Sequence, residues 1–93
     1  PQYPNMGLGY DKELLDWLQT YTFPLEKKYA DINYAKKVYN EVVKNTLRFG
    51  TTTACYFGTI HLESTLELAN ACLLNIQRAF IGKVNMTDPE TPE

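Results

Sequence analysis

The side chains that could do chemistry in this sequence include a single histidine, His61, and two cysteines, Cys55 and Cys72. One histidine cannot supply the paired imidazoles of a zinc site, and neither cysteine lies at a metal-ligand spacing from other such residues. The five glycines form neither a dinucleotide-binding fingerprint nor a phosphate-binding loop. The sequence by itself therefore predicts no catalytic residue and no metal ligand.

His61 is a candidate for contact with a ligand because it follows a predicted strand. Gly50 suits the left-handed conformation that ends a helix. Residues 51–57 are β-branched, aromatic or small and carry no charge, which is typical of a strand covered on both faces. The loop through His61 then lies at the carboxyl end of the strand, where α/β folds place their ligands. A capping or surface role for His61 is the alternative.

The first helical segment is broken by a proline. Asp11 can cap this helix, which ends near Thr22 because the residue before a proline avoids helical geometry. Pro24 then begins a new turn, and Glu26 lies in it, close to the positive end of the helix dipole. Glu26 is interpreted from this position as a solvated carboxylate at a helix start.

The clearest helix spans residues 33–49, with Asp31 or Asn33 as its N-cap. Its apolar side chains recur at helical spacing, and its lysines occupy the opposite, solvated face. Residues 64–67 read Ser-Thr-Leu-Glu, a capping box that begins a further helix ending near Ile76.

Residues 78–84 read as a second strand, lengthened to residue 86. The order strand, helix, strand predicts a parallel, right-handed βαβ unit. Two strands that are apolar on both faces cannot be buried by these helices alone, so we interpret the chain as a piece of a larger α/β sheet or barrel. Residues 1–87 form one partial domain, and the acidic, proline-containing residues 88–93 form a tail or linker.

The chain has 93 residues and a formal net charge of −2, with 9 Lys+Arg against 11 Asp+Glu. Because it has no basic cluster, neither nucleic acid nor an anionic membrane is expected as a partner. No apolar run approaches the roughly 20 residues of a membrane span, and the start is unlike a signal peptide. We therefore expect a cytoplasmic protein with two free, buried thiols, whose sequence begins as if within a longer one.

Three stretches of the sequence carry a family resemblance: L-L-D-W-L-Q-T-Y-T-F-P-L-E at 14–26, N-T-L-R-F-G-T-T-T-A-C-Y-F-G-T-I-H at 45–61 and Q-R-A-F-I-G-K-V at 77–84. They closely resemble the guanine deaminase family of the metal-dependent amidohydrolase superfamily. The elements L-x-x-W-L-x-x-x-x-x-P-x-E and G-T-T-T are shared with related purine and triazine hydrolases, whereas the variants Y-T-F-P-x-E, T-A-C-Y-F and Q-R-A-F-I-G-K-V are typical of guanine deaminases. The resemblance covers nearly the whole chain.

This resemblance implies a (β/α)8 TIM barrel, to which the chain contributes helices, strand 2, a helix and strand 3. It implies a zinc-dependent hydrolase of purine catabolism that converts guanine to xanthine and ammonia, with one zinc ion per full-length protein and a homodimeric parent. The zinc ligands are expected outside this chain, which begins directly after the family's H-x-H-A segment at the end of the first strand. The fragment alone is therefore expected to be inactive.

Three residues are candidate substrate contacts. Gln2 matches the family's glutamine that contacts the purine, since one amide offers both a donor and an acceptor to a heterocycle. Glu26 matches a glutamate that contacts the nucleoside sugar in adenosine-type deaminases, a group that guanine lacks. His61 is not one of the family's metal ligands and is a candidate from its position alone.

Two alternatives remain open beside a guanine deaminase. The parent protein can be a related amidohydrolase that acts on another aminated heterocycle. The chain can also be a truncated, non-catalytic product that binds protein through its exposed strand edges.

Overall fold

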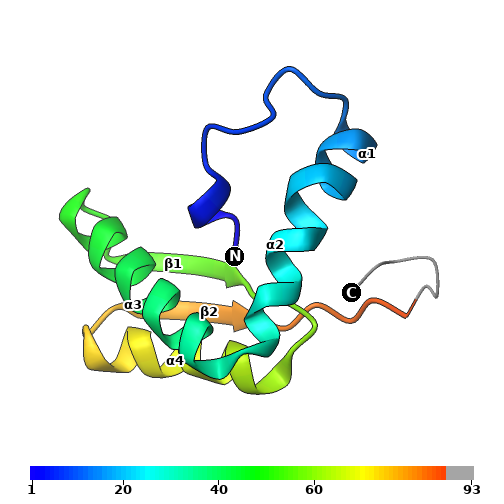
Figure 1. Ribbon diagram of the computed structural model, residues 1–93. Helices are drawn as coiled ribbons and strands as arrows, with labels where there is room; N and C mark the ends of the chain where they lie inside the picture. The colour runs from blue at the N-terminus through cyan, green and yellow to red at the C-terminus, as the bar shows by residue number, and fades with distance from the viewer. Residues whose placement is uncertain (88–93) are drawn as a thin grey trace.

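The computed structural model describes residues 1–87 of the 93-residue chain. In chain order, its elements are a 3₁₀ turn (Tyr3–Asn5), α1 (Leu14–Trp17), a π-helical turn (Leu18–Thr22), α2 (Phe23–Lys27), a 3₁₀ turn (Lys28–Ala30), α3 (Ile32–Arg48), β1 (Thr53–Phe57), α4 (Leu62–Leu74) and β2 (Arg78–Gly82) (Figure 1). The tail predicted at 88–93 lies outside the described residues. Among these residues, no helix has the length and apolar character needed to cross a membrane.

The two strands form the parallel βαβ unit that the sequence predicts. β1 and β2 pair in parallel, with Ala54 opposite Ala79 and Tyr56 opposite Ile81, and α4 connects them. The side chains at these four positions are partly buried. They face a core to which α3 and α4 contribute Tyr39, Val43, Leu68, Ala71 and Cys72. The α/β class is therefore confirmed.

The opposite face of the sheet is uncovered within residues 1–87. Phe57 is 72% exposed and Phe80 is 68% exposed. Burial alternates along β1 because α3 and α4 pack against the same face of the sheet. Residues 1–87 therefore do not cover the strand on both faces, and Cys55 is exposed rather than buried, whereas Cys72 is buried as expected. The open apolar surface agrees with the interpretation of the chain as a piece of a larger sheet.

The longest helix, α3, begins and ends as the sequence predicts. The Asp31 carboxylate accepts hydrogen bonds from the backbone N–H of Asn33 at 2.9 Å and of Tyr34 at 3.4 Å, so Asp31 is the N-cap. Gly50 follows the helix with a φ of +90°, a left-handed conformation that glycine adopts without strain. This turn directs the chain into β1.

The helices α1 and α2 form one continuous column, and the break predicted near Thr22 is absent. A π-helical turn joins them, in which the Phe23 N–H donates to the Leu18 carbonyl. Pro24 lies in the first turn of α2, and because proline has no N–H, it cannot donate the next backbone hydrogen bond of this continuous column. The helix α1 begins without a side-chain cap, so the cap predicted at Asp11 is also wrong.

The capping box predicted at residues 64–67 does not form. The helix α4 begins earlier, at Leu62, with His61 in the N-cap position. Ser64 is therefore inside the helix, where it is buried, and its hydroxyl donates a hydrogen bond to the Tyr29 carbonyl. A side chain that could have capped its own helix instead ties α4 to the segment before α3.

The end of α4 is set by Ile76, which adopts a left-handed conformation with a φ of +56°. The helix ends at Leu74, before the predicted end, and β2 ends at Gly82, short of residue 84 and of the lengthening predicted to residue 86. Ile76 is 91% exposed, so packing of its side chain does not offset the strain of a β-branched residue in this conformation.

Replacing Ile76 by glycine should therefore stabilise the protein by about 1 kcal/mol, because relief of the left-handed strain exceeds the entropic cost of glycine. Urea unfolding followed by circular dichroism measures the change. Leu74→Gly is the matched control, since Leu74 is exposed and helical, and glycine there should cost about 1 kcal/mol. Equal destabilisation by the two substitutions would contradict the assignment of strain to Ile76.

Candidate substrate site

Two of the residues predicted to bind substrate, Gln2 and Glu26, are in direct contact. Gln2 Nε2 donates a hydrogen bond to Glu26 Oε1 at 2.6 Å, across 24 residues of sequence. Glu26 lies in the first turn of α2, as predicted. It is only 9% exposed, because the first residues of the chain lie beside α2 (Figure 1). The interpretation of Glu26 as a solvated carboxylate is therefore wrong.

A cluster of tyrosines holds the start of the chain beside α2. Tyr29 is fully buried, and its hydroxyl donates to the Pro1 carbonyl at 2.8 Å. Its ring stacks on Tyr39 with 5.0 Å between centroids and meets Tyr34 edge-on at 5.3 Å. Burial raises the pKa of Tyr29 and of Tyr39 above the usual tyrosine range, so the Tyr29 hydroxyl stays protonated and able to donate.

A hollow of about 260 Å³ opens beside Gln2. Aromatic rings and two side-chain amides form its walls. Such a combination of flat apolar walls and a few polar groups suits a planar, polar heterocycle. The lining residues are Gln2, Tyr3, Asn5, Met6, Tyr10 and Trp17.

The two amides of this hollow each have a buried atom without a hydrogen-bond partner in the described residues: Gln2 Oε1, an acceptor, and Asn5 Nδ2, a donor. A buried polar atom without a partner is costly, so such atoms indicate places where a further group binds. Thr22 Oγ1 and the Tyr39 hydroxyl also lack a partner there, but neither residue lines the hollow. The sequence does not indicate Asn5, because an asparagine in a loop rich in proline and glycine carries no distinguishing signal.

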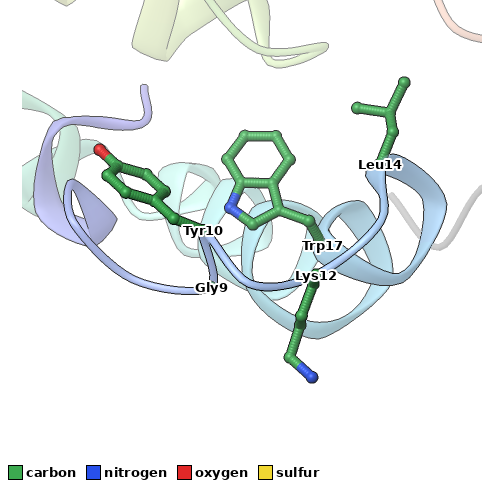
Figure 2. A pocket seen from close by; sticks show the side chains of 5 residues that line it. All are labelled: Gly9, Tyr10, Lys12, Leu14 and Trp17. Atoms are coloured by element: carbon green, nitrogen blue, oxygen red, sulfur yellow. The ribbon is translucent and has the colours of Figure 1, made fainter.

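Trp17 lines both this hollow and a second one. Its Nε1 donates to the Leu8 carbonyl at 3.2 Å, which ties the preceding loop to α1. Gly9 in that loop has a φ of +74°, and a Cβ there would lie 2.9 Å from the Trp17 ring. In Figure 2 the Tyr10 and Trp17 rings lie on one side of the backbone and Lys12 points to the other. The second hollow, of about 430 Å³, is lined by Gly9, Tyr10, Lys12, Leu14 and Trp17.

His61, the third predicted contact, is part of the turn that starts α4. Its ring Nδ1 forms a hydrogen bond of 2.8 Å with the hydroxyl of Thr59, a fully buried residue, and its backbone N–H donates to the same oxygen at 3.3 Å. His61 does not line the hollow beside Gln2. The structure thus gives His61 a role in the turn, and a role in substrate binding stays a prediction.

The metal site that the family resemblance implies is expected to take its ligands from outside this chain. Within residues 1–87, no three histidine, cysteine, aspartate or glutamate side chains lie together as a possible set of metal ligands. What this part of the chain does bring together is an amide oriented by a carboxylate, a second amide and a hollow with aromatic walls. That arrangement can bind and orient a heterocycle.

These features define the chain as an α/β segment with a candidate small-molecule site ahead of its βαβ unit. No family model matches the chain. The guanine deaminase of Dictyostelium discoideum is 53% identical to it over 93 residues, which cover 100% of this chain and 20% of that protein. The guanine deaminase of Homo sapiens is 50% identical over 96 residues, covering 99% of this chain and 21% of that protein.

Solved structures give the same result. A crystal structure of guanine deaminase from C. acetobutylicum with bound guanine in the active site matches this chain with a TM-score of 0.90 and 46% identity, covering 97% of this chain and 22% of that one. The E. coli guanine deaminase matches with a TM-score of 0.78 and 38% identity, covering 88% and 19%. By sequence and by fold, the chain is a homologue of one segment of guanine deaminase, and it spans about a fifth of the length of these relatives.

Proposed function

We propose that this chain is part of a guanine deaminase that hydrolyses guanine to xanthine and ammonia. The observation that carries the proposal is the match with a TM-score of 0.90, over 97% of the chain, to a guanine deaminase with guanine bound in its active site. Identities of 53% to the enzyme from Dictyostelium discoideum and 41% to the enzyme from Escherichia coli support it. A cytoplasmic location, a role in purine catabolism and a homodimeric parent belong to the same proposal.

β1 and β2 are proposed to be strands 2 and 3 of a (β/α)8 barrel. In such a barrel, helices cover the outer face of each strand, and the inner face packs against side chains of the other strands. The single covered face of this sheet supports the placement, because α3 and α4 would then be outer helices. Phe57 and Phe80, on the open face, would point into the barrel and be covered there.

Zinc is proposed as the cofactor of the full-length enzyme, with its ligands outside residues 1–87. Support for this proposal comes from the similarity of the chain to guanine deaminases, a family of the metal-dependent amidohydrolases. The role proposed for this chain in the full-length enzyme is to bind guanine and to orient it.

Gln2 is proposed to contact guanine in the hollow that it lines. Its Oε1 is buried without a partner within residues 1–87, so an N–H group of a bound guanine would satisfy it. Asn5 Nδ2, also buried without a partner there, would donate to an acceptor atom of the same base. Guanine carries both kinds of group at its edges, which supports a purine base as the occupant.

The proposal is tested with the full-length protein by following the loss of guanine absorbance together with the release of ammonia. We expect both signals, and we expect a zinc chelator to abolish them. The 93-residue chain alone is the control and should show no turnover. Turnover of another aminated heterocycle with guanine left intact would contradict the substrate assignment. Guanine turnover by the 93-residue chain would contradict the placement of the metal ligands elsewhere.

A further inference from the structure

The contact between Gln2 and Glu26 determines which way the Gln2 amide points. Gln2 Nε2 donates to Glu26 Oε1, and the two atoms lie 2.6 Å apart. An ionised carboxylate can only accept hydrogen bonds, so the amide must turn its NH₂ group toward Glu26. The amide oxygen of Gln2 must then point away from Glu26.

That oxygen is the atom available to a ligand. Gln2 Oε1 is buried without a hydrogen-bond partner in the described residues, and Gln2 lines the hollow of about 260 Å³. If the amide were reversed, it would offer two N–H donors to a ligand in place of one acceptor. The orientation of this side chain therefore decides whether the site attracts an N–H group or an acceptor atom.

Glu26 is well placed to fix that orientation. It is 9% exposed and belongs to α2, which continues the column of α1 without a break. One helical turn further on, Tyr29 donates to the carbonyl of Pro1 at 2.8 Å. Residues three apart on a helix lie on the same face, so Glu26 and Tyr29 hold the two consecutive residues Pro1 and Gln2 from one surface.

We propose that Glu26 is a positioning residue, which locks the Gln2 amide so that Gln2 Oε1 accepts a hydrogen bond from an N–H group of the purine. This inference rests on the proposed contact between Gln2 and guanine. It replaces a direct contact of Glu26 with substrate, and it explains why a carboxylate is useful in a site whose substrate has no sugar. The site selects bases that present an N–H group to Gln2.

A double-mutant cycle in the full-length enzyme tests the inference, with KM and kcat for guanine measured for Gln2→Ala, Glu26→Leu and the double variant. Glu26→Leu should raise KM roughly tenfold with little change in kcat, because the amide is no longer held. In the Gln2→Ala background the same substitution should leave KM unchanged. Glu26→Gln should stay within about threefold of the wild type, since its own amide oxygen can accept from Gln2.

Glu63→Leu is the matched control, because Glu63 lies in the first turn of α4 but is exposed, and its KM should equal that of the wild type. If Glu26→Leu does not fold, Glu26→Ala takes its place in the cycle. An equal rise in KM in both backgrounds would overturn the inference while leaving the Gln2 contact intact. An unchanged KM for Gln2→Ala itself would instead overturn the proposed contact with guanine.

Discussion

Replacing Gln77 by alanine is expected to lower the free energy of unfolding by about 2–4 kcal/mol. Gln77 is 6% exposed. Its Nε2 donates to Thr46 Oγ1 at 3.0 Å and to the Thr51 carbonyl at 2.9 Å. Its Oε1 accepts from the Tyr56 hydroxyl at 2.7 Å and from Cys72 Sγ at 3.8 Å. The amide thus joins α3, the entry to β1, β1 itself and α4 at one buried point.

Truncation at this position removes all of these hydrogen bonds at once, most of them partly buried, which is why the expected loss exceeds that of one ordinary hydrogen bond. Urea unfolding of the full-length protein measures it. Gln19→Ala is the matched control, because Gln19 is exposed in the π-helical turn, and its stability should change by less than about 0.5 kcal/mol. Similar losses of unfolding free energy for the two variants would show that the hydrogen bonds of Gln77 do not stabilise the contacts between α3, β1 and α4.

Replacing Gln2 by alanine is expected to weaken guanine binding by about 1–3 kcal/mol, a loss of roughly 5-fold to 150-fold. The substitution removes the acceptor proposed for the purine N–H group. It also removes the donor that Glu26 receives at 2.6 Å, so the hydrogen-bonding environment of a buried carboxylate changes as well. Both effects act on the bound base, so KM should rise more than kcat falls.

Steady-state kinetics with guanine measure this effect, and Gln19→Ala again serves as the control, with unchanged KM expected for an exposed glutamine. A KM for Gln2→Ala within twofold of the wild type would remove Gln2 from the binding site. The hollow beside it would then have another occupant.

The parts of the fold that the sequence predicts correctly depend on local signals. The helix α3 has a regular apolar stripe, a strong N-cap at Asp31 and a glycine at its end, and these three signals agree with each other. The parallel pairing of β1 and β2 follows from the order strand, helix, strand. Such features are determined within a few residues or by chain order.

The errors occur where a side chain bonds to a distant segment. Ser64 matches a capping motif, but its hydroxyl bonds to the Tyr29 carbonyl, 35 residues away. The strand β1 is as apolar as a doubly covered strand, although the described residues cover only one of its faces. In both cases the local pattern is compatible with the predicted role, but tertiary contacts determine the hydrogen-bond partner of the side chain and the coverage of the strand.

The candidate site was predicted in part. The family resemblance singles out Gln2 and Glu26 separately, but it cannot show that they bond to each other across 24 residues of sequence. The sequence does not indicate Asn5. The feature that distinguishes this residue is the burial of its side-chain amide, and no sequence pattern near it predicts that burial. His61 was singled out from its place after a strand, whereas the structure shows its ring bonded to Thr59.

The most direct test of the site is a crystal structure of the full-length protein with guanine bound. We expect an N–H group of guanine within hydrogen-bond distance of Gln2 Oε1, with Gln2 Nε2 still donating to Glu26. Guanine bound elsewhere, with the hollow beside Gln2 empty or the Gln2 amide turned away from Glu26, would contradict the assignment of this site.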